Sequence, residues 1–347
     1  MTDRKINWYR TPLDPKELQS LTARSDAKGL LQAGSFILIF LVTTGISLFF
    51  FLRQMWIPMV VACYLHSMFL FFVSMAAAVH ELSHGTAFKS RRLNDFFYYL
   101  CCFLTWNNPV HFRASHTYHH LYTVHRGTDL EVMQGPVKDK LNWKQLIFWL
   151  TFNAPVFWRW MKIAVLHAFG KGDAEYFFWK PLFEKDDPKR ASMIRFARFM
   201  VLGHLVLALV FAYFQLWVLI YLVTFGVFFA TFLGMYCGSI QHTGLAETTP
   251  DWRMVCHTVE CGPIISYLYW NMNFHIEHHM YAAVPFYNLP KLHKLAAGDF
   301  PVPHRSFLAA IAVLYRIKKE QKKDPSYIHV PAFPPTATPA RIQEVPT

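Results

Sequence analysis

The chain has 347 residues, of which 54% are hydrophobic and 17% aromatic, and its formal net charge is +12. These apolar fractions exceed those of soluble domains, whereas a mean hydropathy of only +0.20 indicates that much of the chain lies outside lipid. The basic residues flank apolar runs instead of forming one stripe with interleaved aromatics, which argues against nucleic-acid binding and favours anionic lipid heads. None of the six cysteines forms a CxxC pair, which argues against a zinc ribbon or a thioredoxin-like motif.

The first apolar runs follow a polar segment of mixed charge, residues 1–30, in which we expect no cleavable signal peptide. No Asp, Glu, Lys or Arg occurs from Gly29 to Leu52, nor from Gln54 to His80. Each run exceeds the roughly 20 residues that a helix needs to cross a bilayer. We therefore predict spans near 31–52 and 57–79, joined as a tight hairpin.

A second charge-free stretch runs from Phe199 to Ala246 and has room for two further spans. We place them near 199–214 and 217–238, with a turn at Phe214-Gln215. The expected fold is an all-α integral membrane protein with four transmembrane helices in two hairpins. The membrane domain covers 31–300, and residues 301–347 form a C-terminal tail, of which the proline-rich part from residue 329 is expected to be disordered.

Lys and Arg are concentrated outside both hairpin turns, in the N-terminal, central and C-terminal segments. With an even number of spans, the positive-inside rule places all three segments, and so both termini, in the cytoplasm. Two shorter apolar stretches, 96–106 and 145–158, are too short to span and are expected in the interface or beneath a cytoplasmic helical cap.

Histidines form three clusters, HxxxH at His80 and two HxxHH patterns at His116 and His275. Residues three or four positions apart share one face of a helix, so each cluster presents its imidazoles in one direction. All three clusters are predicted on the cytoplasmic side and can converge there. Independent core histidines would have no reason to do so.

The number of imidazoles indicates which metal they hold. A zinc site usually takes three or four protein ligands, so a membrane zinc hydrolase would leave several histidines unused. A metal transporter would place its ligands near mid-membrane instead of beyond the ends of the spans. Two irons, each bound by four or five nitrogens with one coordination position open, account best for the number of imidazoles.

These boxes, with hydrophobic hairpins between them, resemble the membrane fatty-acid desaturase and hydroxylase family of non-haem di-iron oxidases. The stretches Gln241–Glu247 and Tyr269–His279 resemble its bacterial members, and the likeness extends over about residues 30–300. The resemblance implies eight iron ligands: His80, His84, His116, His119, His120, His275, His278 and His279. It also implies a ninth, for which His242 matches better than His257.

The resemblance further implies O2 as co-substrate and attack on an unactivated C–H bond of a fatty acyl chain or fatty acid, most simply desaturation. Hydroxylation and decarboxylation to a terminal alkene are alternatives that the boxes do not separate. No fused haem or ferredoxin motif is visible, so the electrons are expected from a separate carrier of the ferredoxin, rubredoxin or cytochrome b5 type. A bacterial inner membrane is the expected location.

Several other polar residues receive more ordinary interpretations. His66 and His204 lie inside apolar runs and are expected to bond to backbone or hydroxyl groups. His111 and His125 flank the second box and are weak ligand candidates. Acids near the boxes could orient ligating imidazoles from behind. They are Glu81, Asp129 and Glu277, with Asp95 a weaker candidate.

Overall fold

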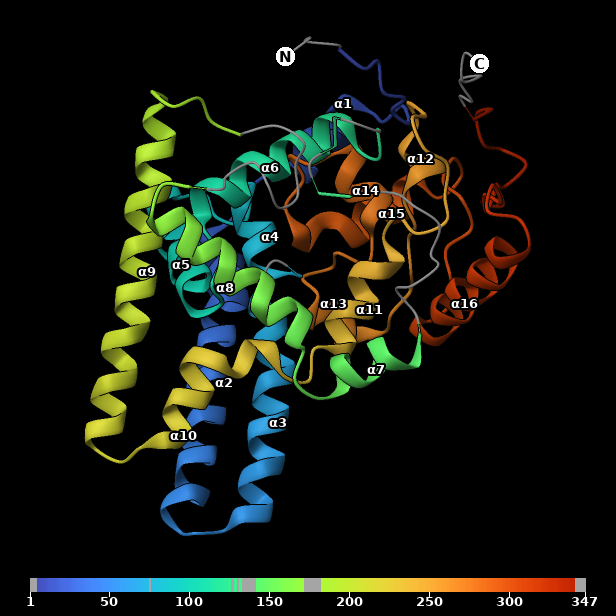
Figure 1. Ribbon diagram of the computed structural model, residues 1–347. Helices are drawn as coiled ribbons and strands as arrows, with labels where there is room; N and C mark the ends of the chain where they lie inside the picture. The colour runs from blue at the N-terminus through green and yellow to red at the C-terminus, as the bar shows by residue number, and fades with distance from the viewer. Residues whose placement is uncertain are drawn as a thin grey trace. The chain divides into compact units, whose positions relative to one another are not determined.

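A computed structural model of the chain (Figure 1) describes residues 5–74, 76–125, 128–129, 131–132, 142–171 and 182–340. Within these ranges the regular structure is helical, and only three isolated bridges pair single residues in extended conformation. The chain divides into two compact units. The first, called here the site unit, comprises residues 1–24, 115–142 and 236–347, and the second, the hairpin unit, comprises 25–114 and 143–235.

The hairpin unit contains the long apolar helices. Its elements are α2 (Asp26–Leu52), α3 (Trp56–Val73), α4 (Ala78–Ser83), α5 (Arg91–Leu104), α7 (Trp143–Leu150), α8 (Ala154–Ala168), α9 (Pro188–Tyr213), α10 (Trp217–Leu219), a π-helix (Ile220–Phe225) and a 3-10 helix (Gly226–Phe228). Helices α6 (Pro109–Tyr122) and α11 (Phe232–Ile240) each have residues in both units.

Three helices of the described chain are long and apolar enough to cross a membrane: Asp26–Leu52, Trp56–Ser83 and Pro188–Tyr213. Figure 1 shows α2 and α3 as an antiparallel pair with a short turn at one end. Gln54 in that turn has a φ of 55°, and Gln215, which follows α9, has a φ of 58°. Both tight turns lie where the sequence predicts them, and each uses a left-handed glutamine to reverse the chain.

The expected span at 217–238 is not one continuous helix. The apolar helical segment Trp217–Phe228 is followed by Phe229 in extended conformation, and Ala230 has a φ of 49° before α11 begins. The connection between α7 and α8 bonds to the interrupted backbone: Asn153 N donates to Phe228 O (2.7 Å), and Ala230 N donates to Thr151 O (3.0 Å). These bonds replace those that a continuing helix would make, so the interruption leaves these backbone groups satisfied.

The two histidines within apolar helices have the ordinary partners that were predicted for them. His66 contacts the Thr43 hydroxyl through Nδ1 (2.8 Å) and the Leu222 carbonyl through Nε2 (3.2 Å). His204 contacts the Phe103 carbonyl through Nε2 (2.9 Å). Both imidazoles therefore cross-link segments of the hairpin unit.

The site unit contains short helices linked by long connections. They are α1 (Pro15–Leu21), α12 (Trp252–Val255), α13 (Pro263–Leu268), α14 (His275–Met280), a 3-10 helix (Phe286–Asn288), α15 (Leu289–Ala296) and α16 (Phe307–Lys323). Their core includes the fully buried Trp270 and Arg253. Arg253 pairs with Asp251 (2.7 Å) and Asp299 (2.8 Å), and its guanidinium lies 3.9 Å from the ring centre of Tyr9.

The expectation of a disordered tail is wrong for residues 329–340, and residues 341–347 lie outside the described part. His329 N donates to Gly244 O (2.7 Å), and Thr338 N donates to Asp299 Oδ1 (2.7 Å). Val302 N donates to Ala332 O (2.8 Å). Prolines favour extended conformations in this part of the tail. Its backbone N–H groups then bond to acceptors of the site unit that lie outside helices, namely a backbone carbonyl and a carboxylate.

Candidate metal centre

Seven of the nine predicted ligands belong to the site unit. The C-terminal half of α6 carries His116, His119 and His120, and α14 carries His275, His278 and His279. His242 follows the end of α11 at Ile240. The i, i+3, i+4 spacing gives each helix one imidazole face, as the sequence predicts.

Four buried histidines form a group whose ligand atoms all lie within 4.8 Å of one another: His119, His242, His275 and His279. Nε2 of His275 lies 3.0 Å from Nε2 of His242 and 3.1 Å from Nε2 of His279. Two nitrogens bound side by side to one metal, each about 2.1 Å from it, lie about 3 Å apart. The nitrogen spacing in this group therefore suits a metal ion.

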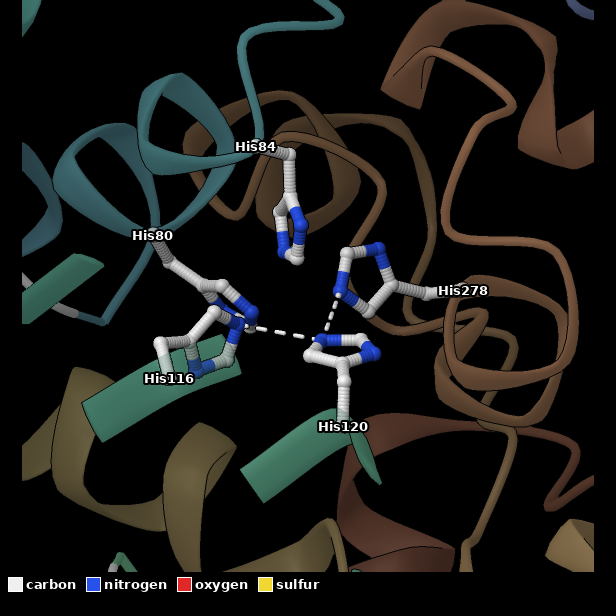
Figure 2. A group of neighbouring side chains, drawn as sticks. All are labelled: His80, His84, His116, His120 and His278. Atoms are coloured by element: carbon white, nitrogen blue, oxygen red, sulfur yellow. Dashed lines mark hydrogen bonds between the residues drawn. The ribbon is translucent and has the colours of Figure 1, made fainter. Parts of the chain in front are cut away.

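A second set lies next to the first. Nε2 of His120 lies 3.1 Å from Nε2 of His116 and 3.1 Å from Nε2 of His278. Figure 2 shows these three rings turned toward one another, and it also draws His80 and His84 of the hairpin unit. The His120 ring stacks on that of His279 with centres 4.2 Å apart, which links the two sets within the site unit.

Hydrogen bonds behind two of the rings fix their tautomers. Nδ1 of His242 lies 2.8 Å from the Val255 carbonyl, which can only accept, so the proton belongs on Nδ1. Nδ1 of His279 lies 3.1 Å from the Thr123 hydroxyl, whose own proton is donated to His119 O. His279 therefore also carries its proton on Nδ1. Both assignments follow from the partners and leave a lone pair on each Nε2.

Carboxylates fix the tautomers of two more rings. Nδ1 of His119 donates to Asp129 (2.9 Å), and Nδ1 of His116 donates to Glu131 (2.9 Å). A carboxylate behind a ligating histidine fixes the ring orientation and makes the other nitrogen more basic. Nε2 consequently carries a lone pair in His119, His242 and His279 of the first set and in His116 of the second.

Lone pairs that converge in a buried site repel one another unless a cation lies between them. His275 can supply at most one Nε2 proton, which cannot serve both His242 and His279. Imidazole nitrogens at this spacing are ligands that zinc, copper, iron and nickel accept. The donor set therefore fits a bound metal better than a proton-linked histidine network.

The electrostatic surroundings keep most of these ligands neutral. Burial lowers the pKa of His242 to about 3, with the neighbouring His119 adding to the effect. Burial and neighbouring imidazoles also hold the pKa of His275 and His279 well below the usual value. Burial would lower the pKa of His119 too, but Asp129 more than offsets it and the net shift is upward. A metal requires neutral imidazoles, so the low values favour binding.

The acids proposed to orient ligands have different positions. Asp129 holds His119, as expected. Glu277 instead accepts from Thr258 (2.6 Å) and contacts Nδ1 of His293. Asp95 pairs with Arg113 (2.9 Å), and Glu81 is buried on α4. Sequence reasoning missed Glu131 and Thr123; the signal for Glu131 is an acid two residues after Asp129, just beyond the second box.

Three other histidines lie outside both sets. His257, the rival to His242, contacts the Thr243 carbonyl through Nε2 (3.2 Å) and His304 through Nδ1 (3.1 Å). His125 contacts the Thr123 carbonyl through Nδ1 (3.0 Å), and the ring of His111 lies 4.8 Å from that of His167. On the hairpin unit, the rings of His80 and His84 lie 5.5 Å apart at the end of α4.

Comparison with known proteins identifies one family. The family described as fatty acid desaturase matches this chain over residues 21–308, a range that contains all the histidines of both sets. A search among curated proteins gives no match.

Proposed function

Since the chain belongs to the fatty acid desaturase family, we propose that it is an O2-dependent di-iron oxidase that desaturates a fatty acyl chain or fatty acid. The observation that carries the proposal is the grouping of imidazole nitrogens in two sets, with a lone pair on Nε2 of His119, His242 and His279 in the first and of His116 in the second. Partners on Nδ1 orient His119, His242 and His279 in the first set and His116 in the second.

The proposed ligand assignment uses nine histidines. His119, His242, His275 and His279 hold one iron. His80, His84, His116, His120 and His278 hold the other. When bound, two irons would supply the redox chemistry that activates O2 and abstracts hydrogen from an unactivated C–H bond.

The chain's own residues position and protect the metals. Asp129 and Glu131 prevent rotation of His119 and His116, so both rings are oriented before the metal binds. Burial of His119, His275 and His279 keeps water from their nitrogens. Dry, rigid surroundings of this kind limit side reactions of a strong oxidant.

A lipidic substrate and a membrane location are supported by the surfaces of the long helices. Leu38 on α2 is 60% exposed, Val60 on α3 is 61% exposed and Leu209 on α9 is 61% exposed. Such surfaces are stable in lipid. We propose four crossings, including an interrupted one at 217–238, with both termini in the cytoplasm of a bacterial cell and electrons supplied by a separate carrier.

Mass spectrometry of lipids and free acids from cells that express the chain tests the reaction. Desaturation gives products that have lost two hydrogens, whereas hydroxylation adds one oxygen and decarboxylation removes CO2. Cells that express His278→Ala are the matched control and should lack the product. Metal analysis of the purified protein should find two irons per chain; a single zinc with no oxidised product would overturn the proposal in favour of a hydrolase.

A further inference from the structure

The N-terminal residues pack directly on the segments that carry the candidate ligands. Trp8 Nε1 donates to the Leu121 carbonyl on α6 (3.0 Å), and Tyr9 N donates to Pro250 O (2.8 Å). Thr11 N contacts Sδ of Met280 at the end of α14 (3.2 Å). Residues 8–11 therefore form a strap, fixed at three points of the site unit.

Trp8 of this strap stacks on a second tryptophan, Trp252. The rings of Trp8 and Trp252 are almost parallel, with an interplanar angle of 6° and centres 4.4 Å apart. Trp252 is buried, with 3% of its surface exposed, whereas Trp8 is partly exposed. The pair thus connects solvent with the interior of the site unit.

The inner tryptophan points toward a candidate ligand. Trp252 Nε1 donates to Thr123 Oγ1 (3.4 Å), and that oxygen lies 3.1 Å from Nδ1 of His279. A continuous series of contacts therefore runs from a partly exposed indole through a second indole and one hydroxyl to the imidazole. The buried N–H of Trp252 needs an acceptor in any case, and the acceptor it has is the hydroxyl that also bonds to a candidate ligand.

Two exposed basic residues flank the outer tryptophan in the sequence. Arg10 is exposed and its guanidinium carbon lies 5.9 Å from the ring centre of Trp252, and Lys5 is exposed three residues before Trp8. The whole chain carries a formal charge of +12. Such a surface attracts an acidic protein partner and accelerates encounter.

We propose that an acidic one-electron carrier protein docks over Lys5, Trp8 and Arg10, and that Trp8 and Trp252 conduct its electrons to the metal centre. The inference rests on the proposed function, because it requires a metal centre that is reduced in each cycle. In each transfer the carrier loses one electron and the centre gains it at the His279 end. No bond forms or breaks, and no proton has to move.

The test measures oxidation of a reduced carrier by the iron-loaded protein under anaerobic conditions in a stopped-flow instrument. The probes are a [2Fe–2S] ferredoxin, a rubredoxin and the soluble domain of cytochrome b5, with dithionite as a small reductant. Trp8→Ala and Trp252→Phe should remove the fast phase with the carrier that reacts fastest with the wild type. Reduction by dithionite and bound iron should be unchanged. Arg10→Glu should lower the bimolecular rate at low salt by about tenfold and weaken its salt dependence.

Matched controls come from another exposed tryptophan next to a basic residue. Trp143 is 68% exposed and the Nζ of Lys144 lies 5.7 Å from the centre of its ring, but both belong to the hairpin unit. Trp143→Ala and Lys144→Glu should leave the rates unchanged. The proposal is overturned if these controls slow the carrier equally, if Trp8→Ala and Trp252→Phe react at the wild-type rate, or if no carrier reduces the wild type. Absence of iron from the wild-type protein would instead refute the proposed function, so the two failures are distinguishable.

Discussion

Nδ1 of His119 lies 2.9 Å from Oδ2 of Asp129, and backbone N–H groups hold that carboxylate in place. Val124 N donates to Oδ2 (2.7 Å), and Glu131 N donates to Oδ1 (2.8 Å). The acid therefore cannot turn away from the ring without losing backbone bonds. The acid thereby couples the backbone after α6 to the orientation of a candidate metal ligand.

Asp129→Asn tests this relationship. The amide keeps the shape but loses the charge, and one of its two ends must present N–H groups to a donor. We expect iron affinity to fall by about 10–100-fold, the usual effect of removing a carboxylate behind a ligating histidine. Titration with a competing chelator measures it. Asp14→Asn, at an exposed helix cap, is the control; equal affinity in Asp129→Asn and wild type would contradict the assigned role.

His119→Ala and His278→Ala remove one candidate ligand from each set. Both variants should lose activity and bind less iron, because a coordination position is lost and a buried gap replaces it. Membrane insertion should be unchanged, since neither residue lies in an apolar span. Iron content per chain and the membrane fraction of the protein are the measurements. Full activity in either variant would refute the ligand assignment.

His66→Ala and His204→Ala should retain wild-type iron content. Their imidazoles bond to Thr43 and to the carbonyls of Leu222 and Phe103, and neither belongs to a metal-binding set. Their loss should lower the thermal stability in detergent, because buried acceptors lose a donor. Normal expression with loss of iron in either variant would show that the helix assignments are wrong.

Arg253→Met should destabilise the site unit. The guanidinium is fully buried between Asp251 and Asp299, and its removal leaves Asp251 buried without its cation. Breaking a buried ion pair at one partner costs about 3–5 kcal/mol. A thermal melt of the purified protein in detergent should show a clear fall in Tm. Lys323→Met, which breaks an exposed pair with Glu320, should leave the Tm almost unchanged.

Single cysteines in a cysteine-free background test the orientation in the membrane. Gln54→Cys and Gln215→Cys, in the two turns, should react with an impermeant thiol reagent added to intact cells. Glu320→Cys, on α16, should react only after lysis, because the Lys and Arg distribution places the C-terminal region in the cytoplasm. Labelling of position 320 from outside would contradict a cytoplasmic metal centre.

Several features of this protein were predictable because they depend on local sequence. Charge-free runs long enough to cross a bilayer predicted spans near 31–52 and 199–214, where the structure has the longer helices Asp26–Leu52 and Pro188–Tyr213, since hydrophobic length is a property of one segment. Histidine spacing predicted the imidazole faces of α6 and α14, since helix periodicity is local too. The partners of His66 and His204 were predicted in kind, because a buried imidazole needs acceptors or donors wherever it lies.

Other features were decided by contacts between distant residues. Thr123 and His279 are 156 positions apart, so no local pattern indicates that the hydroxyl fixes that tautomer. The helix interruption near Ala230 exists because Thr151 and Asn153 supply backbone bonds there. Residues 329–340 of the tail pack on the site unit because Asp299 and Gly244 accept N–H groups from them. The sequence by itself determined which residue types were present and how each helix presents them, whereas only the tertiary structure decided which partners satisfy them. Hydrogen bonds depend on distance and direction in space, and chain spacing specifies these only within a helix.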